Sequence, residues 1–159
     1  MNIFTYIKAF YHLWKDIQAQ RAFNKEFLLP YMEALEKKYD GRFHPGQKEK
    51  IKNYYGLFIP AVLAASFKRL YNEPFTAEEQ ERVTLFGILT PVGDDLFDID
   101  KLDIGAIRTI TYTPESFEAQ TFSAKVAKEI QSKLLQTVPD KAAYLEASKN
   151  VFEIQIDTI

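Results

Sequence analysis

The chain contains no cysteine, which excludes disulfide bonds, thiolate metal sites and a cysteine nucleophile. It has two histidines, His12 and His44, and neither belongs to a Glu-x-x-His motif. A carboxylate-bridged di-iron bundle and a zinc site with several histidines are therefore not expected. Neither histidine has a recognisable serine or aspartate partner for a catalytic triad. The six glycines are scattered and form no glycine-rich phosphate loop.

The chain also lacks a strong net charge and a long apolar run. The net charge of −2 gives no electrostatic reason to expect nucleic acid or an anionic membrane as a partner. No stretch approaches the ~20 consecutive apolar residues of a membrane span. Lys8 and Lys15 interrupt the apolar run that a signal peptide requires. We expect a cytoplasmic protein with no integral membrane segment and no nucleic-acid partner.

Length and apolar spacing together predict an all-α protein. A chain of 159 residues has room for one domain, and 14% of the residues are aromatic, which favours a core rich in rings. Apolar residues recur every three to four positions and no strand has a partner, so we expect residues 1–159 to form an antiparallel helical bundle of about six main helices. The spacing of the first stripe predicts a helix with this side in the core, and its residues are Ile3, Ile7, Phe10, Trp14 and Ile17.

Proline, glycine and capping residues set the expected bounds of the next helices. A second helix, over 27–35, is expected to stop at Asp40-Gly41. A third, over 47–70, should be kinked by Pro60, and its expected inner side holds Ile51, Tyr55, Phe58, Val62 and Phe67. Thr76 and Glu79 form a capping-box pattern that predicts the start of a fourth helix, which should bend at Pro91.

The last third of the chain is expected to add two helices. Residues 99–112 predict a loop or a short helix, because no second β-rich segment exists to pair with them. Pro114 and Pro139-Asp140 are expected to open the fifth and sixth helices. The expected buried side of these two helices comprises Phe117, Ala124, Ala127, Ile130, Leu134, Tyr144, Ala147, Val151 and Ile154.

An acidic cluster closes the fourth helical pattern: Asp94, Asp95, Asp98 and Asp100 are four carboxylates in seven residues. Asp94 and Asp98 would lie one turn apart on one side of a helix, where like charges are unfavourable unless a cation compensates them. Oxygen ligands without histidine or cysteine suit Mg²⁺. An EF-hand is excluded, because a loop starting at Asp98 has Asp103 where glycine is required. The alternative is a solvated helix end followed by an acidic loop.

The segment Leu-Thr-Pro-Val-Gly-Asp-Asp-Leu-Phe-Asp, residues 89–98, resembles the first aspartate-rich motif, Asp-Asp-x-x-Asp (DDxxD), of the class I isoprenoid synthases. This family includes trans-prenyltransferases and class I terpene synthases. The resemblance implies a partial isoprenoid-synthase-like fold around an apolar cavity, Mg²⁺ as cofactor held by Asp94, Asp95 and Asp98, and a prenyl diphosphate as substrate. Asp100 is an additional acid. Ionisation of an allylic diphosphate leaves concentrated negative charge on pyrophosphate, which Mg²⁺ stabilises.

The chain also departs from the family pattern. The two arginines that follow the motif in chain-elongating prenyltransferases are missing, with only Arg108 in the following loop, so chain elongation is not expected. The second metal motif does not occur: Thr111 and Glu115 fit two of its positions, but Ile107 breaks the third. About six helices are roughly half of the family's complement. We therefore interpret the chain as the N-terminal half, or another fragment, of such an enzyme.

Two hypotheses about function follow from the sequence. The first is a Mg²⁺-dependent enzyme that uses an isoprenoid diphosphate for prenyl transfer or terpene synthesis, or a fragment of one. The second is a non-enzymatic helical interaction domain whose acidic cluster is solvated. Half of a ligand-enclosing bundle would leave an apolar surface exposed, which predicts self-association as a homodimer.

Overall fold

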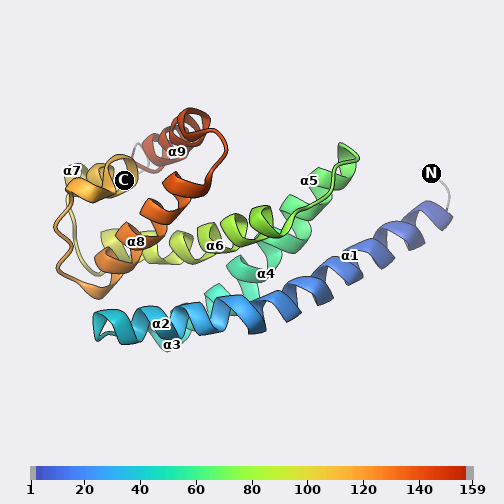
Figure 1. Cartoon of the computed structure of the whole chain (residues 1–159), viewed down its shortest axis with the longest axis horizontal. Coiled ribbons are helices and arrows are strands. Elements are labelled where there is room, and N and C mark those ends of the chain that lie inside the picture. Colours follow the sequence, from blue (N-terminus) through green and yellow to red (C-terminus); the bar gives the residue numbers. More distant parts are fainter. Residues whose placement is uncertain (1–2, 157–159) are drawn as a thin grey trace. The chain divides into compact units, whose positions relative to one another are not determined.

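The computed structural model describes residues 3–156, which form helices joined by short loops, with no strand in this range (Figure 1). The predicted all-α fold is confirmed. The chain divides into two compact units, Met1–Pro91 and Val92–Ile159, which we call unit 1 and unit 2 and treat separately. The expectation of a single domain over 1–159 stays a prediction.

Unit 1 begins with one long helical run. It comprises α1 (Ile3–Phe23), the π-helix η1 (Asn24–Leu28) and α2 (Leu29–Tyr39), which follow one another without a loop. Two separate helices were expected here. A proline inside a helix lacks the N–H that would bind the carbonyl four residues back, and the π turn lies directly before Pro30. The run ends as predicted at Asp40, whose backbone is left-handed with φ 48°.

The third helical region is also continuous, but it is not a regular α-helix. It comprises α3 (Pro45–Lys50), the π-helix η2 (Ile51–Tyr55), α4 (Gly56–Phe58), the π-helix η3 (Ile59–Ala64) and α5 (Ala65–Leu70). Pro60 lies in the second π segment, so the helix departs from regular α geometry at this proline. The predicted kink itself stays a prediction.

The helix α6 (Ala77–Asp98) starts at the predicted capping box. Thr76 Oγ1 accepts a hydrogen bond from the Glu79 N–H at 3.2 Å, and the Thr76 N–H donates to Glu79 Oε2 at 2.9 Å. Pro91 lies inside α6, which continues to Asp98. A Cβ on Gly87 would lie 2.8 Å from the carbonyl oxygen of Tyr55, so glycine allows α6 to approach the third helical region closely at this point.

The core of unit 1 is smaller than the sequence predicted. Its buried hydrophobic residues are Leu28, Met32, Leu35, Phe43, Ile51, Leu57, Ala61, Ala65, Leu85 and Ile88. The expected core stripe of the first helix is wrong, because Ile3, Ile7, Phe10 and Trp14 are 58–69% exposed. Phe58 and Phe67, expected on the inner side of the third helix, are exposed as well. Periodicity identifies an apolar side of a helix, but it does not identify what that side contacts.

Unit 2 takes in the end of α6 and the helices α7 (Ile104–Tyr112), η4 (Pro114–Ser116), α8 (Phe122–Thr137) and α9 (Lys141–Ile156). The short helix expected within 99–112 is therefore present. The expected start of the fifth helix is wrong: Pro114 opens a single 3-10 turn, and α8 starts only after Thr121, whose hydroxyl accepts from the Ala124 N–H at 3.2 Å.

The core of unit 2 is built mainly by α8, and its buried hydrophobic residues are Val92, Leu96, Ile107, Ile110, Ala124, Val126, Ala127, Ile130 and Leu134. The burial predicted for Ala124, Ala127, Ile130 and Leu134 is confirmed, whereas Ala147 is exposed. Arg108 pairs with Glu153 at 2.7 Å and thereby joins α7 to α9. The predictions for the side chains of Val151 and Ile154 lie outside the described residues.

Candidate functional site

The predicted metal ligands lie in the last two turns of α6. Asp94 and Asp98 are exposed and Asp95 is half-buried, while Val92 and Leu96 are buried at 1% and 3% exposure. At 100° per residue the three aspartates fall within about 100° of helix surface, and the buried pair lies on the other side. Asp94 and Asp98 are separated by about 6 Å along the helix axis. The helix thus places the three carboxylates on one side, as the sequence predicted.

Asp100, the fourth acid of the cluster, has a structural contact. Its carboxylate accepts a hydrogen bond from the hydroxyl of Thr121, the residue that caps α8. The backbone around it forms the end of α6: the Asp100 N–H donates to the Asp95 carbonyl, and Leu102 donates to Leu96 at 3.0 Å across the left-handed Lys101. Asp100 therefore joins the end of α6 to the start of α8, both within unit 2.

No group of three or more histidine, cysteine, aspartate or glutamate side chains is arranged to hold a metal ion within the part of the chain that the structure describes. The three aspartates therefore do not form a preassembled cage. Mg²⁺ commonly keeps several waters and binds through one or two carboxylates together with substrate phosphates. The all-oxygen donor set and the exposure of Asp94 and Asp98 fit that mode, in which the substrate completes the coordination.

A buried polar network in unit 1 was not predicted from the sequence. The amide of Gln20, which is 1% exposed, lies 2.9 Å from Asn24 Oδ1, 3.0 Å from the Gly56 carbonyl and 2.9 Å from Thr84 Oγ1. Asn24 Nδ2 also donates to the Gly56 carbonyl, at 2.9 Å. In an α-helix this carbonyl would accept from residue 60, and Pro60 has no N–H to donate. Gln20 and Asn24 supply the missing donors.

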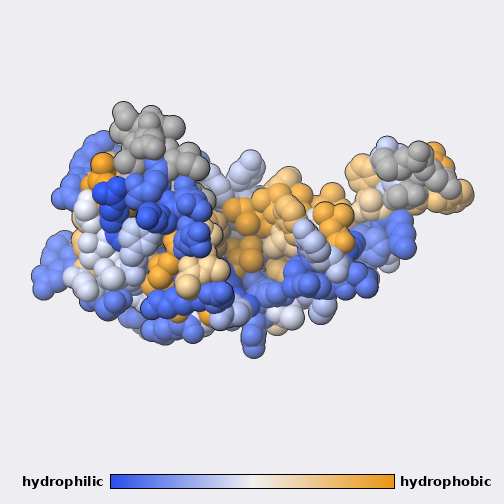
Figure 2. All heavy atoms as spheres, turned by 90° about the horizontal axis from the view of Figure 1, so that it is seen from above, coloured by the Kyte–Doolittle hydropathy of each residue, from blue (hydrophilic) through white to orange (hydrophobic). Residues whose placement is uncertain are grey.

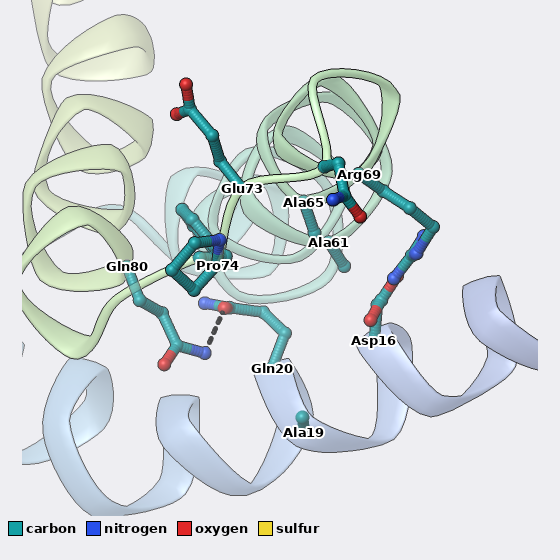
Figure 3. Close-up of a pocket in the computed structure, with 11 residues that line it drawn as sticks. Asp16, Ala19, Gln20, Ala61, Ala65, Arg69, Glu73, Pro74 and Gln80 are labelled. Carbon is teal, nitrogen blue, oxygen red and sulfur yellow. Dashed lines mark hydrogen bonds and ion pairs between the residues drawn. The ribbon is translucent and has the colours of Figure 1, made fainter.

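The same network borders a cavity of about 530 Å³ between α1, the η3–α5 segment and the loop before α6 (Figure 3). Figure 3 shows Arg69 and Asp16 pointing toward each other on one side and Gln80 donating to Gln20 on the other. The Arg69–Asp16 ion pair is 2.5 Å long. In the lining of this cavity, Asp16 binds Arg69 and Gln80 binds Gln20. The lining contains no nucleophile with an adjacent base, so we assign no chemistry to the cavity.

Ion pairs at the end of α5 shift two pKa values in unit 1. Lys68 binds Glu73 at 2.6 Å and Glu79 at 2.9 Å, and these hydrogen bonds raise the pKa of Lys68, Glu73 having the largest effect. The pKa of Glu79 is lowered, first by the hydrogen bond from the Thr76 N–H and then by Lys68. Because Glu79 also completes the capping box of α6, these pKa shifts are explained by the helix cap and do not indicate a catalytic group.

In unit 2, burial raises the pKa of Tyr144, whose hydroxyl donates to Gln131 at 2.9 Å. Gln131 in turn donates to the Thr111 carbonyl at 2.6 Å, so the three residues connect α7, α8 and α9. This contact, like the Arg108–Glu153 pair, supports the fold of unit 2. Among the described residues, Asp94, Asp95 and Asp98 of α6 are the candidate site that the sequence motif predicts and that the helix places on one side.

None of the helices within residues 3–156 combines the length and the apolar character needed to cross a membrane. Comparison with known proteins gives no match to a family model, to a curated protein or to a solved structure.

Proposed function

We propose that the chain is part of a Mg²⁺-dependent enzyme that uses an isoprenoid diphosphate, for prenyl transfer or terpene synthesis, in the cytoplasm. The observation that carries the proposal is the Asp-Asp-x-x-Asp motif at the end of α6, with Asp94 and Asp98 exposed one turn apart and Asp95 beside them. These three residues would hold the Mg²⁺. The metal would neutralise charge on the diphosphate leaving group.

The burial pattern around the motif supports this assignment. Val92 and Leu96 anchor the opposite side of α6 in the core of unit 2, so the carboxylates are held on a packed helix rather than on a free loop. Lys101 in the left-handed conformation and Asp100 bound to Thr121 end the helix directly after Asp98. Asp94, Asp95 and Asp98 are therefore held on a packed helix. A diphosphate would bind Mg²⁺ on the solvent-facing side of these carboxylates.

Calorimetry with Mg²⁺ and a prenyl diphosphate tests the proposal. Because three carboxylates that each bind through one oxygen supply only about half of the about six oxygens that Mg²⁺ prefers, each ligand alone should bind weakly and each should strengthen the other. We expect the coupling to be about tenfold or more in affinity. The double variant Asp94→Asn with Asp98→Asn should lose this coupling while its circular dichroism spectrum stays helical.

The matched control is Glu26→Gln with Glu33→Gln, which removes the same charge from two exposed positions of the first helical run. This control should bind as the parent does. If the aspartate double variant also keeps the full coupling, the acidic cluster is not a metal site and the proposal is wrong. If the control loses as much coupling as the aspartate variant, the effect is one of net charge rather than of coordination.

A second candidate function is a helical interaction domain, and the exposed aromatic side chains of α1 favour it. Phe4, Phe10 and Trp14 are 73%, 69% and 58% exposed, which is unusual for large apolar side chains gathered on one helix. We also propose that copies of the chain associate as a homodimer, as expected for a molecule with such a surface. Static light scattering over a range of protein concentrations tests the association.

A further inference from the structure

The first turns of α1 carry an apolar surface that we call the α1 stripe. It consists of Ile3, Ile7, Phe10 and Trp14, and it is flanked by Phe4, Tyr6 and Tyr11. These seven side chains are 49–73% exposed. At 100° per residue they fall within about 160° of the helix surface, so they form one broad face rather than isolated side chains.

The stripe is exposed because it extends past the helix that α1 packs against. Gln20 binds the Gly56 carbonyl, and Asp16, one turn earlier, binds Arg69 near the end of α5 at Leu70. Toward the N-terminus of α1, the residue that α1 contacts therefore lies closer to the end of α5. The turns before Asp16 continue beyond that end, as the N-terminal part of α1 does in Figure 1. Figure 2 shows hydrophobic surface at the right of the view, where these turns lie.

The spacing of the stripe favours another helix as its occupant. Residues 3, 7, 10 and 14 step by four, three and four, which is the heptad spacing of a helix–helix seam. The exposed area of the stripe is also close to what each partner buries in a stable interface. Five aromatic side chains of about 200 Å² each, about half to three quarters exposed, offer roughly 600 Å² before Ile3 and Ile7 are counted. A stable interface buries about 800 Å² on each partner.

We propose that residues 3–14 of α1 pair with the same residues of a second copy of the chain. A second copy presents the identical heptad stripe, so a two-fold interface covers both surfaces at once. A membrane surface is a poorer occupant, because the first turns of α1 carry only two cations beside the stripe, Lys8 and Lys15, and Lys15 Nζ lies 5.7 Å from the centroid of the Tyr11 ring. The inference rests on the self-association proposed above and adds the surface that mediates it.

Trp14 is the single tryptophan of the chain, so its fluorescence reports directly on the stripe. At high concentration we expect a mass twice the 18.4 kDa of one chain and a blue-shifted emission, and dilution should shift the emission to the red as the dimer dissociates. Ile7→Glu with Phe10→Glu should give a monomer with red-shifted emission at every concentration. These positions are exposed, so the fold should survive, and circular dichroism checks this.

The matched control is Tyr54→Glu with Phe58→Glu, which replaces two other exposed aromatic residues of unit 1, at 60% and 49% exposure, by the same charges. This variant should remain a dimer. A monomeric parent at high concentration would overturn both the self-association and the stripe. A stripe variant that remains a dimer, whatever the state of the control, would overturn the stripe alone. A blue shift of the monomer on phosphatidylcholine–phosphatidylglycerol vesicles, without dimer formation, would replace the second copy by a lipid surface.

Discussion

Two buried amide side chains in unit 1 compensate for a proline. Pro60 leaves the Gly56 carbonyl without its helical donor, and the amides of Gln20 and Asn24 bind that carbonyl at 3.0 and 2.9 Å. Because a buried carbonyl without a donor costs free energy, the polar pair is part of the reason the helix can contain a proline at all. Thr84, completely buried on α6, joins the same network through its hydroxyl.

Replacing Gln20 by leucine should therefore destabilise the protein strongly. The change removes an NH₂ group that lies within hydrogen-bond distance of three buried acceptors, and it removes the acceptor for Gln80. We therefore expect the free energy of unfolding to fall by about 1–3 kcal/mol. Urea unfolding followed by circular dichroism measures the change. Gln18→Leu is the control, because Gln18 is exposed two residues earlier on the same helix and should change stability by less than about 0.5 kcal/mol. Equal effects at the two positions would contradict the role of the network.

At the scale of the helix, the capping box of α6 combines a hydrogen-bond cap with a charge effect. The carboxylate of Glu79 accepts from the Thr76 N–H and from Lys68, and both contacts hold the pKa of Glu79 below its usual value. A carboxyl group with a lowered pKa in the folded state stabilises the fold above its unfolded pKa. That contribution is lost as the pH falls through the folded pKa.

Glu79→Gln should accordingly lower the stability of the protein at neutral pH by about 0.5 kcal/mol, because the glutamine amide oxygen can still accept from the Thr76 N–H while the charge at the helix N-terminus and the ion pair with Lys68 are lost. The difference from the parent should shrink as the pH falls, because protonation removes the same charge from the parent. Urea unfolding at a series of pH values measures this difference. Glu78→Gln removes a charge in the same turn without the Thr76 contacts, and its smaller difference from the parent should not follow the same pH profile. A pH-independent cost at Glu79 would show that packing, not ionisation, is lost.

Most of the element boundaries could be predicted from the sequence, because they depend on local chemistry. The Asp40 stop, the Thr76 cap and the disturbance at Pro60 each involve residues close together in the chain. The continuous run from α1 to α2 could not be predicted, since a π turn before Pro30 preserves the helix across the proline. The start of α8 was missed for a related reason: Pro114 suits a 3-10 turn as well as an α-helix.

The sequence predicts that a helix has an apolar side more readily than it predicts which element that side contacts. The stripe of α1 is apolar as expected, but α1 packs on its neighbours through Asp16 and Gln20 further along the chain. The candidate site shows the same limit. Local spacing predicts that Asp94, Asp95 and Asp98 share one side of a helix, yet no spacing rule reveals which distant groups or phosphates would complete a Mg²⁺ site.

For the whole molecule, α6 is the element that both compact units share. Its middle turns supply Leu85 and Ile88, both at 0% exposure, to the core of unit 1. Its last turns supply Val92 and Leu96, at 1% and 3% exposure, to the core of unit 2. The helix α6 runs from Ala77 to Asp98 and includes the boundary between the units at Pro91. Helix formation is cooperative along the chain, so loss of packing at one end weakens the other.

We therefore predict that the two units unfold in one transition. Ile88→Ala and Leu96→Ala each remove a buried side chain, one per unit, and each should lower the free energy of unfolding by about 2–5 kcal/mol. Either change should move the whole urea transition to lower concentration, without a plateau, when it is followed by circular dichroism. Hydrogen exchange provides the independent probe: Leu96→Ala should accelerate the slowest amides around Leu28 and Leu35 in unit 1 as well as those of α8. Two separate transitions, with Leu96→Ala shifting only one, would mean that each unit is stable without the other and that α6 frays between them.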